Sequence, residues 1–416
     1  EGSQTLSGAY EQFTRQTQEN LARTTALFDE SISSSIHQLN ETLDSMRDMT
    51  RGMPQLLSQS RDRYAEQVDQ FVTALVRLQE SEEGAKRLAE KAKALEAEKA
   101  QQAAKDYGTE DAKVYTDYKK LLEDKTIDVV HVCTPNRSHS FITVDALEAG
   151  KHVMCEKPMA INSEEAKKML DAAERTGKKL CIGYQNRYRP EMLYLKKEAE
   201  DGTFGDIYYS EAIAIRRRAV PTWGVFINEY EQGGGPLIDI GTHALDLTLW
   251  TMDNYKPKYC VGTTYHKLNN DTNTGNAWGD WDPAKFTVED SAFGFIVMEN
   301  GATIVLESAW ALNTLDVREA VTTVCGTKAG GDMVNGVRIN SIINGRQSVT
   351  TANLEAGGVA FYAGASKDPA AIEAAQWIDA IVNDKNPCVL PEQAFCVTKI
   401  LEGIYTSAKT GDIFKF

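Results

Sequence analysis

The sequence predicts an α/β protein with three parts: a long, coiled-coil-like helical segment, a partial doubly wound parallel sheet, and an α+β domain on an open antiparallel sheet. Three observations predict this. Residues 1–101 repeat apolar side chains at steps of three and four and lack strand-forming runs. Between residues 102 and 189, β-branched runs alternate with helical stretches. From 190 to 416, several runs alternate polar and apolar residues.

The first segment is rich in Gln, Ser, Thr, Glu and Ala. Its apolar stripe includes Ile32, Ile36, Leu39, Leu43 and Met46, and again Tyr64, Val68, Phe71, Leu75 and Leu78. Such a stripe is typical of a coiled coil or slender bundle. Gly52 and Pro54 interrupt it, and the Ala-, Glu- and Lys-rich stretch from Ser81 to Ala104 favours another helix. We interpret residues 1–101 as an unrelated helical segment, a probable fusion or chimera; the alternative is an oligomerisation arm.

The parallel sheet is expected from three strands, residues 126–134, 152–156 and 179–185, with helices between them. The first helix spans about 140–149 and ends at Gly150, and Asn162 or Ser163 caps the second. In the following domain, Asn300-Gly301 and Asn344-Gly345 predict hairpins in which both turn residues take positive φ. Helices near 237–252, 371–382 and 392–409 are expected to cover one face of its sheet.

Composition narrows the class of protein. A formal net charge of −15 disfavours nucleic acid or an anionic membrane as a partner, because both attract basic surfaces. The seven cysteines stand singly, which favours reduced thiols over a disulfide framework. No apolar run reaches the roughly 20 residues that span a bilayer. We therefore expect a cytoplasmic protein.

Unusual residues follow the three parallel strands. They are Thr134-Pro135-Asn136, Glu156-Lys157-Pro158 and Tyr184-Gln185-Asn186-Arg187. Ligands bind beyond the carboxyl ends of such strands. A lysine at the end of an apolar strand, as Lys157 is, suits proton transfer or hydroxyl orientation; pairing with an acid for structural reasons is the equal alternative.

A second constellation is a glycine run, Gly233 to Gly235, that leads into a helix. Glycines let the backbone approach a ligand closely. On that helix, Asp239, His243 and Asp246 fall at i, i+4 and i+7, on one face. An Asp one turn before a His can orient its imidazole as a general base needs. We predict no metal site, since no Cys/His cluster supports zinc.

Tryptophans on glycine-flanked loops form a third constellation, with Trp223 on one loop and Trp278 and Trp281 on another. Their flat faces could stack on sugars, or equally could cap the loops onto the core. The Arg216–Arg218 run could clamp an anion but more often forms a solvated edge.

Together these motifs resemble the Gfo/Idh/MocA oxidoreductase family from about Gln102 to Phe416. The resemblance rests on Tyr115-Thr116-Asp117-Tyr118, Thr134-Pro135-Asn136 with His139, Ala149-Gly150-Lys151-His152-Val153, Glu156-Lys157-Pro158, Asn186-Arg187-Tyr188, and Asp239 with His243. It implies a Rossmann-like sheet and hydride transfer between NAD or NADP and a secondary hydroxyl of a sugar, cyclitol or glycoside. In that scheme His243 removes the hydroxyl proton, while Lys157 and Asp239 orient the hydroxyl.

The resemblance also implies the remaining site residues. The nicotinamide end would be lined by Thr134, Pro135, Asn136, His139, Glu156, Lys157 and Gln185, and the substrate by Arg187, Tyr188, Trp223, Asp239, His243 and Trp281. It implies a homo-oligomer, a dimer or tetramer, formed through the outer face of the large sheet. Some relatives cleave glycosides with bound NAD, which keeps an NAD-dependent glycoside hydrolase as an alternative.

One expected motif is absent. A Rossmann domain opens with a strand, a G-x-G-x-x-G turn that holds the pyrophosphate, and a helix. No G-x-G-x-x-G occurs in the 416 residues. We therefore expect weak or absent dinucleotide binding, and an exposed edge on the strand near Ile127 to Val132. The remaining alternative is a helical assembly protein that carries an inactive oxidoreductase-like or sugar-binding passenger.

Overall fold

The computed structural model describes residues 82–271, 275–334, 336–354 and 368–416. Two compact units, residues 1–116 and 117–416, are described separately. The first contains helix α2 (Glu82–Tyr107), which confirms the helix expected from Ser81 to Ala104. The apolar repeats predicted before residue 82 lie outside the described residues. The coiled coil and the domain boundaries 1–101, 102–189 and 190–416 stay predictions.

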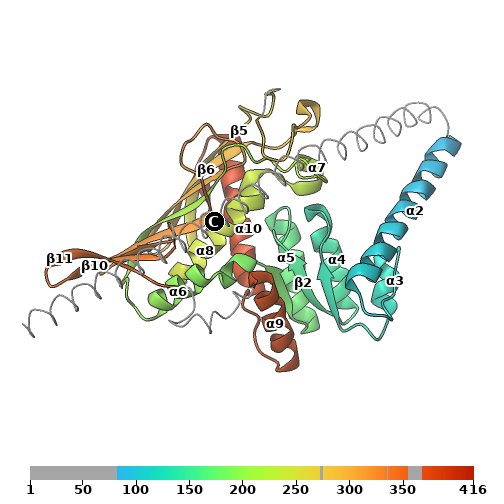
Figure 1. The fold of residues 1–416 in the computed structure, drawn as a ribbon, viewed down its shortest axis with the longest axis horizontal. Coiled ribbons are helices and arrows are strands. Elements are labelled where there is room, and N and C mark those ends of the chain that lie inside the picture. The colour runs from blue at the N-terminus through green and yellow to red at the C-terminus, as the bar shows by residue number, and fades with distance from the viewer. Residues whose placement is uncertain (1–81, 272–274, 335, 355–367) are drawn as a thin grey trace, which may run out of the picture. The chain divides into compact units, whose positions relative to one another are not determined.

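The second unit begins with a three-stranded parallel sheet (Figure 1). Its strands are β1 (Val129–Val132), β2 (His152–Glu156) and β3 (Leu180–Gly183), in the order β1-β2-β3. Helix α3 (Tyr118–Glu123) precedes β1, and α4 (Asn136–Glu148) and α5 (Ser163–Thr176) connect the strands. Within the described part of the chain, β1 pairs with β2 alone, which leaves its other edge open as expected.

The local signals of this sheet are confirmed. Asn162 caps α5 by accepting a hydrogen bond from the Glu165 N–H at 2.8 Å. Gly150 and Gly177, with φ of 81° and 66°, follow α4 and α5 in the left-handed conformation that favours glycine. The apolar strand residues Val153, Cys155 and Ile182 are fully buried, as the β-branched runs predict.

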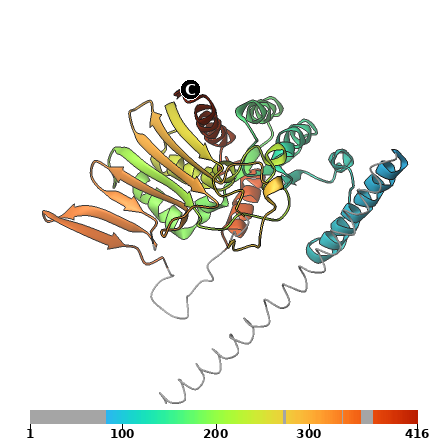
Figure 2. The same ribbon diagram turned by 90° about the horizontal axis from the view of Figure 1, so that it is seen from above.

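The second sheet has nine strands in the order β11-β10-β9-β8-β4-β7-β6-β5-β12. They are β4 (Ile207–Ile215), β5 (Pro257–Tyr265), β6 (Ser291–Met298), β7 (Thr303–Ala309), β8 (Arg318–Gly326), β9 (Gly330–Asp332), β10 (Arg338–Ile343), β11 (Arg346–Thr351) and β12 (Phe414–Lys415). Figure 2 shows these strands fanned side by side, with the β10–β11 hairpin at one end in orange.

The prediction of a purely antiparallel sheet was wrong at one pair, because β4 and β7 run parallel. The chain reaches β7 only after helix α8 (Thr242–Met252), β5 and β6, so no hairpin fixes its direction beside β4. Both predicted hairpins form, between β6 and β7 and between β10 and β11. Asn344 and Gly345 take positive φ as expected, whereas at Asn300-Gly301 only the glycine does.

Helices cover one face of this large sheet. The remaining helices are η1 (Gln185–Tyr188), α6 (Pro190–Glu200), α7 (Glu229–Gln232), η2 (Leu237–Gly241), α8 (Thr242–Met252), η3 (Pro283–Lys285), α9 (Pro369–Val382) and α10 (Pro391–Thr410). Helix α8 packs on β4 and β8, and α10 packs on β5 as well as on α5 and β3. One core therefore joins the two sheets.

The expected position of α9 was wrong. It packs mainly against η1, at the end of β3, and not on the large sheet (Figure 1). Its buried residues, Trp377 and Ala380 among them, face that side. Over the described residues, no helix is both long and apolar enough to cross a membrane.

Candidate active site

Lys157 lies directly after β2, and its side chain reaches Asp239 in η2, the turn that precedes α8. Its Nζ donates to the Asp239 carbonyl oxygen at 2.8 Å and to Asp239 Oδ1 at 2.7 Å. The two side chains are 19% and 12% exposed, so this ion pair is largely withdrawn from water. The structure thus brings together the two residues that the sequence placed 82 positions apart.

Asp239 is fixed from two sides. Its other oxygen, Oδ2, accepts a hydrogen bond from Trp310 Nε1 at 3.0 Å. Burial opposes ionisation, but the charge and hydrogen bond of Lys157 outweigh it and hold the pKa of Asp239 below its ordinary value. The group is therefore a carboxylate at neutral pH.

The expected hydrogen bond from His243 to Asp239 is not formed. Asp239 lies in η2, a single π-helical turn that precedes α8. A π turn holds more than the 3.6 residues of an α turn, so a spacing of four no longer stacks the two side chains. Such turns are frequent at functional sites.

His243 is 8% exposed and lies one residue into α8. Burial and the nearby charge of Lys157 lower its pKa to about 3, so the imidazole is neutral at ordinary pH. Its Nδ1 has no hydrogen-bond partner among the described residues. The Tyr184 ring meets the imidazole edge-on, with centroids 6.1 Å apart, and Tyr184 Oη shares a hydrogen bond with Thr242. The histidine therefore keeps an unused nitrogen in a buried setting.

Asp246 was expected on the same helix face as Asp239 and His243, but its side chain points into the core. It forms a buried ion pair with Arg187, at 2.6 Å and 2.9 Å, and both side chains are at most 1% exposed. Tyr188 is also buried, at 2% exposure. Arg187 and Tyr188, which the resemblance gives to the substrate, are core residues in this geometry.

The residues expected at the nicotinamide end fall into two groups. Thr134, Pro135 and Gln185 are exposed beyond the strand ends, and Glu156 is half-buried beside them. Asn136 instead donates to the Gln232 carbonyl at 3.0 Å. These contacts leave four of the expected residues open to a ligand.

His139 belongs to the second group. It is 1% exposed, and its ring nitrogens lie 2.8 Å from the carbonyl oxygens of Thr134 and Pro158. A neutral imidazole has one N–H, and burial lowers the pKa of His139, so only one contact donates at a time. His139 thus lies between the loops that follow β1 and β2 and contacts the backbone of both.

These residues fit one half of a dinucleotide. The exposed strand ends and the buried, unpartnered Nδ1 of His243 suit a nicotinamide and its ribose together with a hydroxyl substrate. For the pyrophosphate, the described residues provide no glycine-rich turn between a strand and a helix.

The structure also gathers a group that the sequence did not indicate. The ligand atoms of His131, Cys133 and Glu156 lie within 4.8 Å of one another and could hold a metal ion. They also interact without one, since Glu156 Oε1 lies 3.4 Å from His131 Nε2. Hydrogen bonds to Cys133 and Glu156 raise the pKa of His131 to about 10.

The aromatic loops separate into an exposed pair and a buried residue. Trp223 and Trp278 are 52% and 44% exposed and meet edge-on with centroids 5.1 Å apart. Arg216 lies over the Trp278 ring at 5.1 Å, and its guanidinium pairs with Glu319. Trp281 is 6% exposed and donates to the Asn269 carbonyl at 2.8 Å, so it caps its loop onto the core. Trp281, which the resemblance gives to the substrate, is therefore a core residue, and Trp278 lies beside Trp223 instead.

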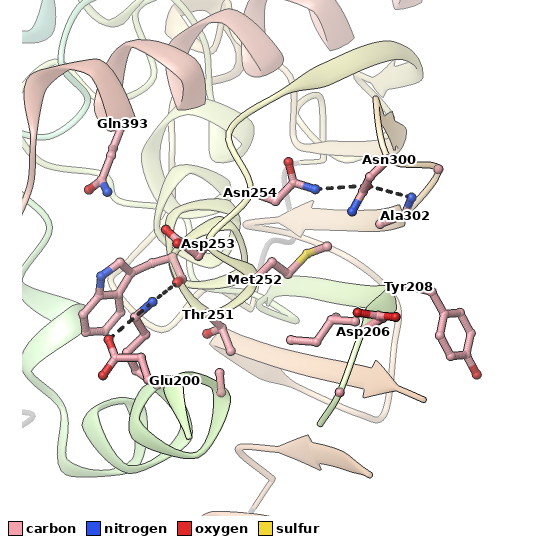
Figure 3. Close-up of a pocket in the computed structure, with 16 residues that line it drawn as sticks. Glu200, Asp206, Tyr208, Thr251, Met252, Asp253, Asn254, Asn300, Ala302 and Gln393 are labelled. Atoms are coloured by element: carbon pink, nitrogen blue, oxygen red, sulfur yellow. Dashed lines mark hydrogen bonds and ion pairs between the residues drawn. The ribbon is translucent and has the colours of Figure 1, made fainter. Parts of the chain in front are cut away.

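A large polar cavity lies away from these residues. It has a volume of about 1000 Å³ and is lined by Lys196, Asp206, Trp250, Asp253 and Asn300 among others (Figure 3). None of the predicted site residues lines it. Size alone therefore does not locate the candidate site.

Comparisons with known proteins identify the family of the chain. Residues 76–184 match the family described as "Oxidoreductase family, NAD-binding Rossmann fold", and residues 192–330 match the "GFO/IDH/MocA C-terminal domain". The first match begins before Gln102, so α2 belongs to the matched region. The predicted domain boundary near residue 102 stays a prediction.

Curated relatives include sugar dehydrogenases. The chain is 42% identical over 234 residues to D-glucoside 3-dehydrogenase of Escherichia coli, covering 56% of this chain and 66% of that protein. It is 31% identical over 176 residues to levoglucosan dehydrogenase of Pseudarthrobacter phenanthrenivorans, covering 40% and 43%. The chain thus spans slightly less than two thirds of the first relative and under half of the second.

Solved structures share the fold. Aldose-aldose oxidoreductase from Caulobacter crescentus has a TM-score of 0.62 at 23% identity, covering 77% of this chain and 89% of that one. Levoglucosan dehydrogenase in complex with NADH and L-sorbose has a TM-score of 0.65 at 22% identity, covering 76% and 87%. With both family domains matched in order along one chain, this protein belongs to the Gfo/Idh/MocA oxidoreductase family.

Proposed function

We propose that the chain is an NAD(P)-dependent oxidoreductase that acts on a secondary hydroxyl of a sugar, cyclitol or glycoside. One observation carries the proposal: a buried Lys157–Asp239 ion pair lies at the end of β2, beside the neutral imidazole of His243. A base, a cation and a carboxylate at the carboxyl end of a parallel sheet are the groups that alcohol oxidation needs.

The three side chains can divide the work. The ammonium of Lys157 has three N–H donors and spends two on Asp239, which leaves one for the substrate oxygen. The neutral His243 accepts the hydroxyl proton. The carboxylate of Asp239 holds Lys157 in place and favours the imidazolium that forms, since it acts to raise the pKa of His243.

The cofactor would lie against the strand ends, held by Thr134, Pro135, Glu156 and Gln185. When bound, nicotinamide supplies the acceptor for the hydride. Because the sequence has no G-x-G-x-x-G turn, we expect this chain to bind the pyrophosphate weakly.

The substrate class follows from the relatives and the aromatic pair. The relatives are named D-glucoside 3-dehydrogenase, levoglucosan dehydrogenase and inositol 2-dehydrogenase, so their names give a glucoside, levoglucosan and inositol as substrates. The exposed Trp223–Trp278 pair offers flat apolar faces of the kind on which sugar rings stack.

We further propose a homo-oligomer formed through the outer face of the large sheet. Val261, Tyr265 and Phe295 are 38–46% exposed on that face, and Val261 is paired with Phe295 across β5 and β6. Neighbouring exposed apolar residues mark association surfaces. Multi-angle light scattering tests this: Val261→Lys together with Phe295→Lys should convert a dimer or tetramer to monomer, and a wild-type monomer would contradict it.

The activity is tested by following dinucleotide reduction with a panel of glycosides, free sugars and inositols. Lys157→Met and His243→Asn should each lower the rate at least about a hundredfold, the scale of a lost acid–base group. Arg175→Met, which removes an exposed ion pair with Glu148, is the matched control and should leave the rate unchanged. Equal rates in Lys157→Met and wild type would refute the assignment.

A further inference from the structure

A buried carboxyl lies directly against the start of the helix that carries the candidate site. Glu289 is 4% exposed and precedes β6. Its Oε2 accepts from the Gly235 N–H at 2.8 Å, and its Oε1 accepts from the Leu237 N–H at 3.1 Å and from Tyr405 Oη at 2.7 Å. Burial raises the pKa of Glu289 to about 7. Three donors thus converge on one buried carboxyl. Glu289 with these hydrogen bonds is called the anchor below.

The glycine run is shaped to this anchor. A Cβ added to Gly235 would lie 2.3 Å from the Glu289 carbonyl oxygen and 3.1 Å from its Cδ. A Cβ added to Gly234 would lie 2.1 Å from Tyr405 Oη. The sequence indicated a close approach to a ligand, whereas in the structure Gly234 and Gly235 approach Tyr405 and Glu289, and a side chain at either position would clash.

The anchor sits where the helix most needs acceptors. The first N–H groups of a helix have no partners within it, so acceptor oxygens placed there satisfy donors that would otherwise be unpaired. The Leu237 N–H opens η2, and Asp239 follows two residues later. Both the carbonyl and the carboxylate of Asp239 bind Lys157, so a shift of this turn moves both contacts together.

There is also space into which the turn could relax. Gly233, Gly234, Glu289 and Tyr405 line a cavity of about 440 Å³. The hydrogen bonds of Glu289 oppose that movement.

We propose that Glu289, supported by Tyr405, is a positioning residue that sets the start of the η2–α8 helix and thereby the geometry of Lys157, Asp239 and His243. Glu289 and Tyr405 act through the backbone of the glycine run and η2, and not by contact with the reacting atoms. The kinetic consequence rests on the proposed oxidoreductase function, but the structural consequence does not.

The structural consequence is tested by the reactivity of His243 towards diethyl pyrocarbonate in the full chain, followed by peptide mass spectrometry. Because His243 is 8% exposed, the wild-type rate should be slow. Glu289→Gln places an amide N–H₂ against a donor and should raise the rate at least about fivefold, as local opening becomes easier. Tyr405→Phe, which removes one of three donors, should raise it about twofold and carries the test if the first variant does not fold.

Glu373→Gln is the matched control. Glu373 is a buried glutamate on α9, 5% exposed, and its Oε1 has no hydrogen-bond partner among the described residues. This variant should leave the His243 rate at the wild-type value. An unchanged rate in Glu289→Gln and Tyr405→Phe, or an equal rise in Glu373→Gln, would overturn the proposal.

The kinetic readout separates this proposal from the function. If sugar oxidation is detected, Glu289→Gln should lower kcat at least about tenfold with KM within about twofold, because misplaced groups slow chemistry more than binding. A raised KM with unchanged kcat would contradict a positioning role. Absence of turnover in the wild type would refute the proposed function, while the His243 reactivity would still decide the role of Glu289.

Discussion

The Arg187–Asp246 pair allows a quantitative test of the core. All five guanidinium N–H donors of Arg187 are used: two on Asp246, one each on the Cys388 carbonyl and Gln393, and one on Tyr255. Arg187→Met keeps the apolar volume but leaves the Asp246 carboxylate buried without its cation. Removing one partner of such a pair costs about 3–5 kcal/mol. We expect a loss of that size in the free energy of unfolding.

Urea denaturation followed by tryptophan fluorescence measures this loss, since all six tryptophans lie between residues 223 and 377. Arg175→Met, at an exposed ion pair screened by water, should cost far less stability than Arg187→Met. The double variant Arg187→Met with Asp246→Leu should recover most of the lost stability, because no charge is left unpaired. The reasoning is refuted if Arg187→Met costs no more than Arg175→Met.

Three further predictions follow from the site. Lys157→Met removes a positive charge that disfavours the imidazolium, so the pKa of His243 should rise from about 3; an NMR titration that finds no rise contradicts the geometry. Folding raises the pKa of Glu289 to about 7. The protonated carboxyl therefore contributes stability that is fully present below pH about 4.5 and is lost as the pH rises to about 7. Unfolding free energies measured across this range should fall less steeply with pH in Glu289→Gln than in wild type. Trp223→Ala should raise KM for a glycoside about two- to tenfold without changing the pKa of His243, and an unchanged KM across the glycoside panel would remove the aromatic pair from the substrate site.

The weak pyrophosphate site has its own test. Isothermal calorimetry with NAD and NADP should give dissociation constants in the millimolar range, because the sequence has no G-x-G-x-x-G motif to bind the pyrophosphate. The adenosine-free fragment nicotinamide mononucleotide is the control and should bind about as well. Saturable micromolar binding of either dinucleotide would show that another segment replaces the missing turn.

The family resemblance implied that Lys157 and Asp239 share one site, and the sequence itself indicated only that Lys157 lies at a strand end. Parallel strands end at one edge of a sheet, and a polar residue that ends an apolar strand has few places to go. The helix cap and turns could also be predicted from the sequence, because the cap at Asn162 and the positive φ of Gly150 and Gly345 involve only neighbouring residues. These features depend on short-range backbone preferences that single residues encode.

Other features could not be read in this way. The periodicity assumed an α-helix through Asp239 and His243, whereas the π turn rotates them apart. Trp310 lies 71 residues from Asp239, whose side chain it binds, and Glu289 lies 54 residues from Gly235, whose backbone N–H it binds. No local sequence pattern marks either residue. The glycine run signalled a close approach without indicating that its partners were Glu289 and Tyr405. Such contacts are set by packing between distant elements.

The most direct test of the central claim is a dinucleotide-reduction assay on the full chain at millimolar NAD and NADP, with methyl glucosides, anhydrosugars and inositols as substrates. These concentrations offset the weak binding expected of the pyrophosphate. A site built on Lys157, Asp239 and His243 should give substrate-dependent reduction that Lys157→Met and His243→Asn abolish and Arg175→Met preserves. No reduction with any sugar at saturating dinucleotide, or reduction that persists in Lys157→Met, would contradict it.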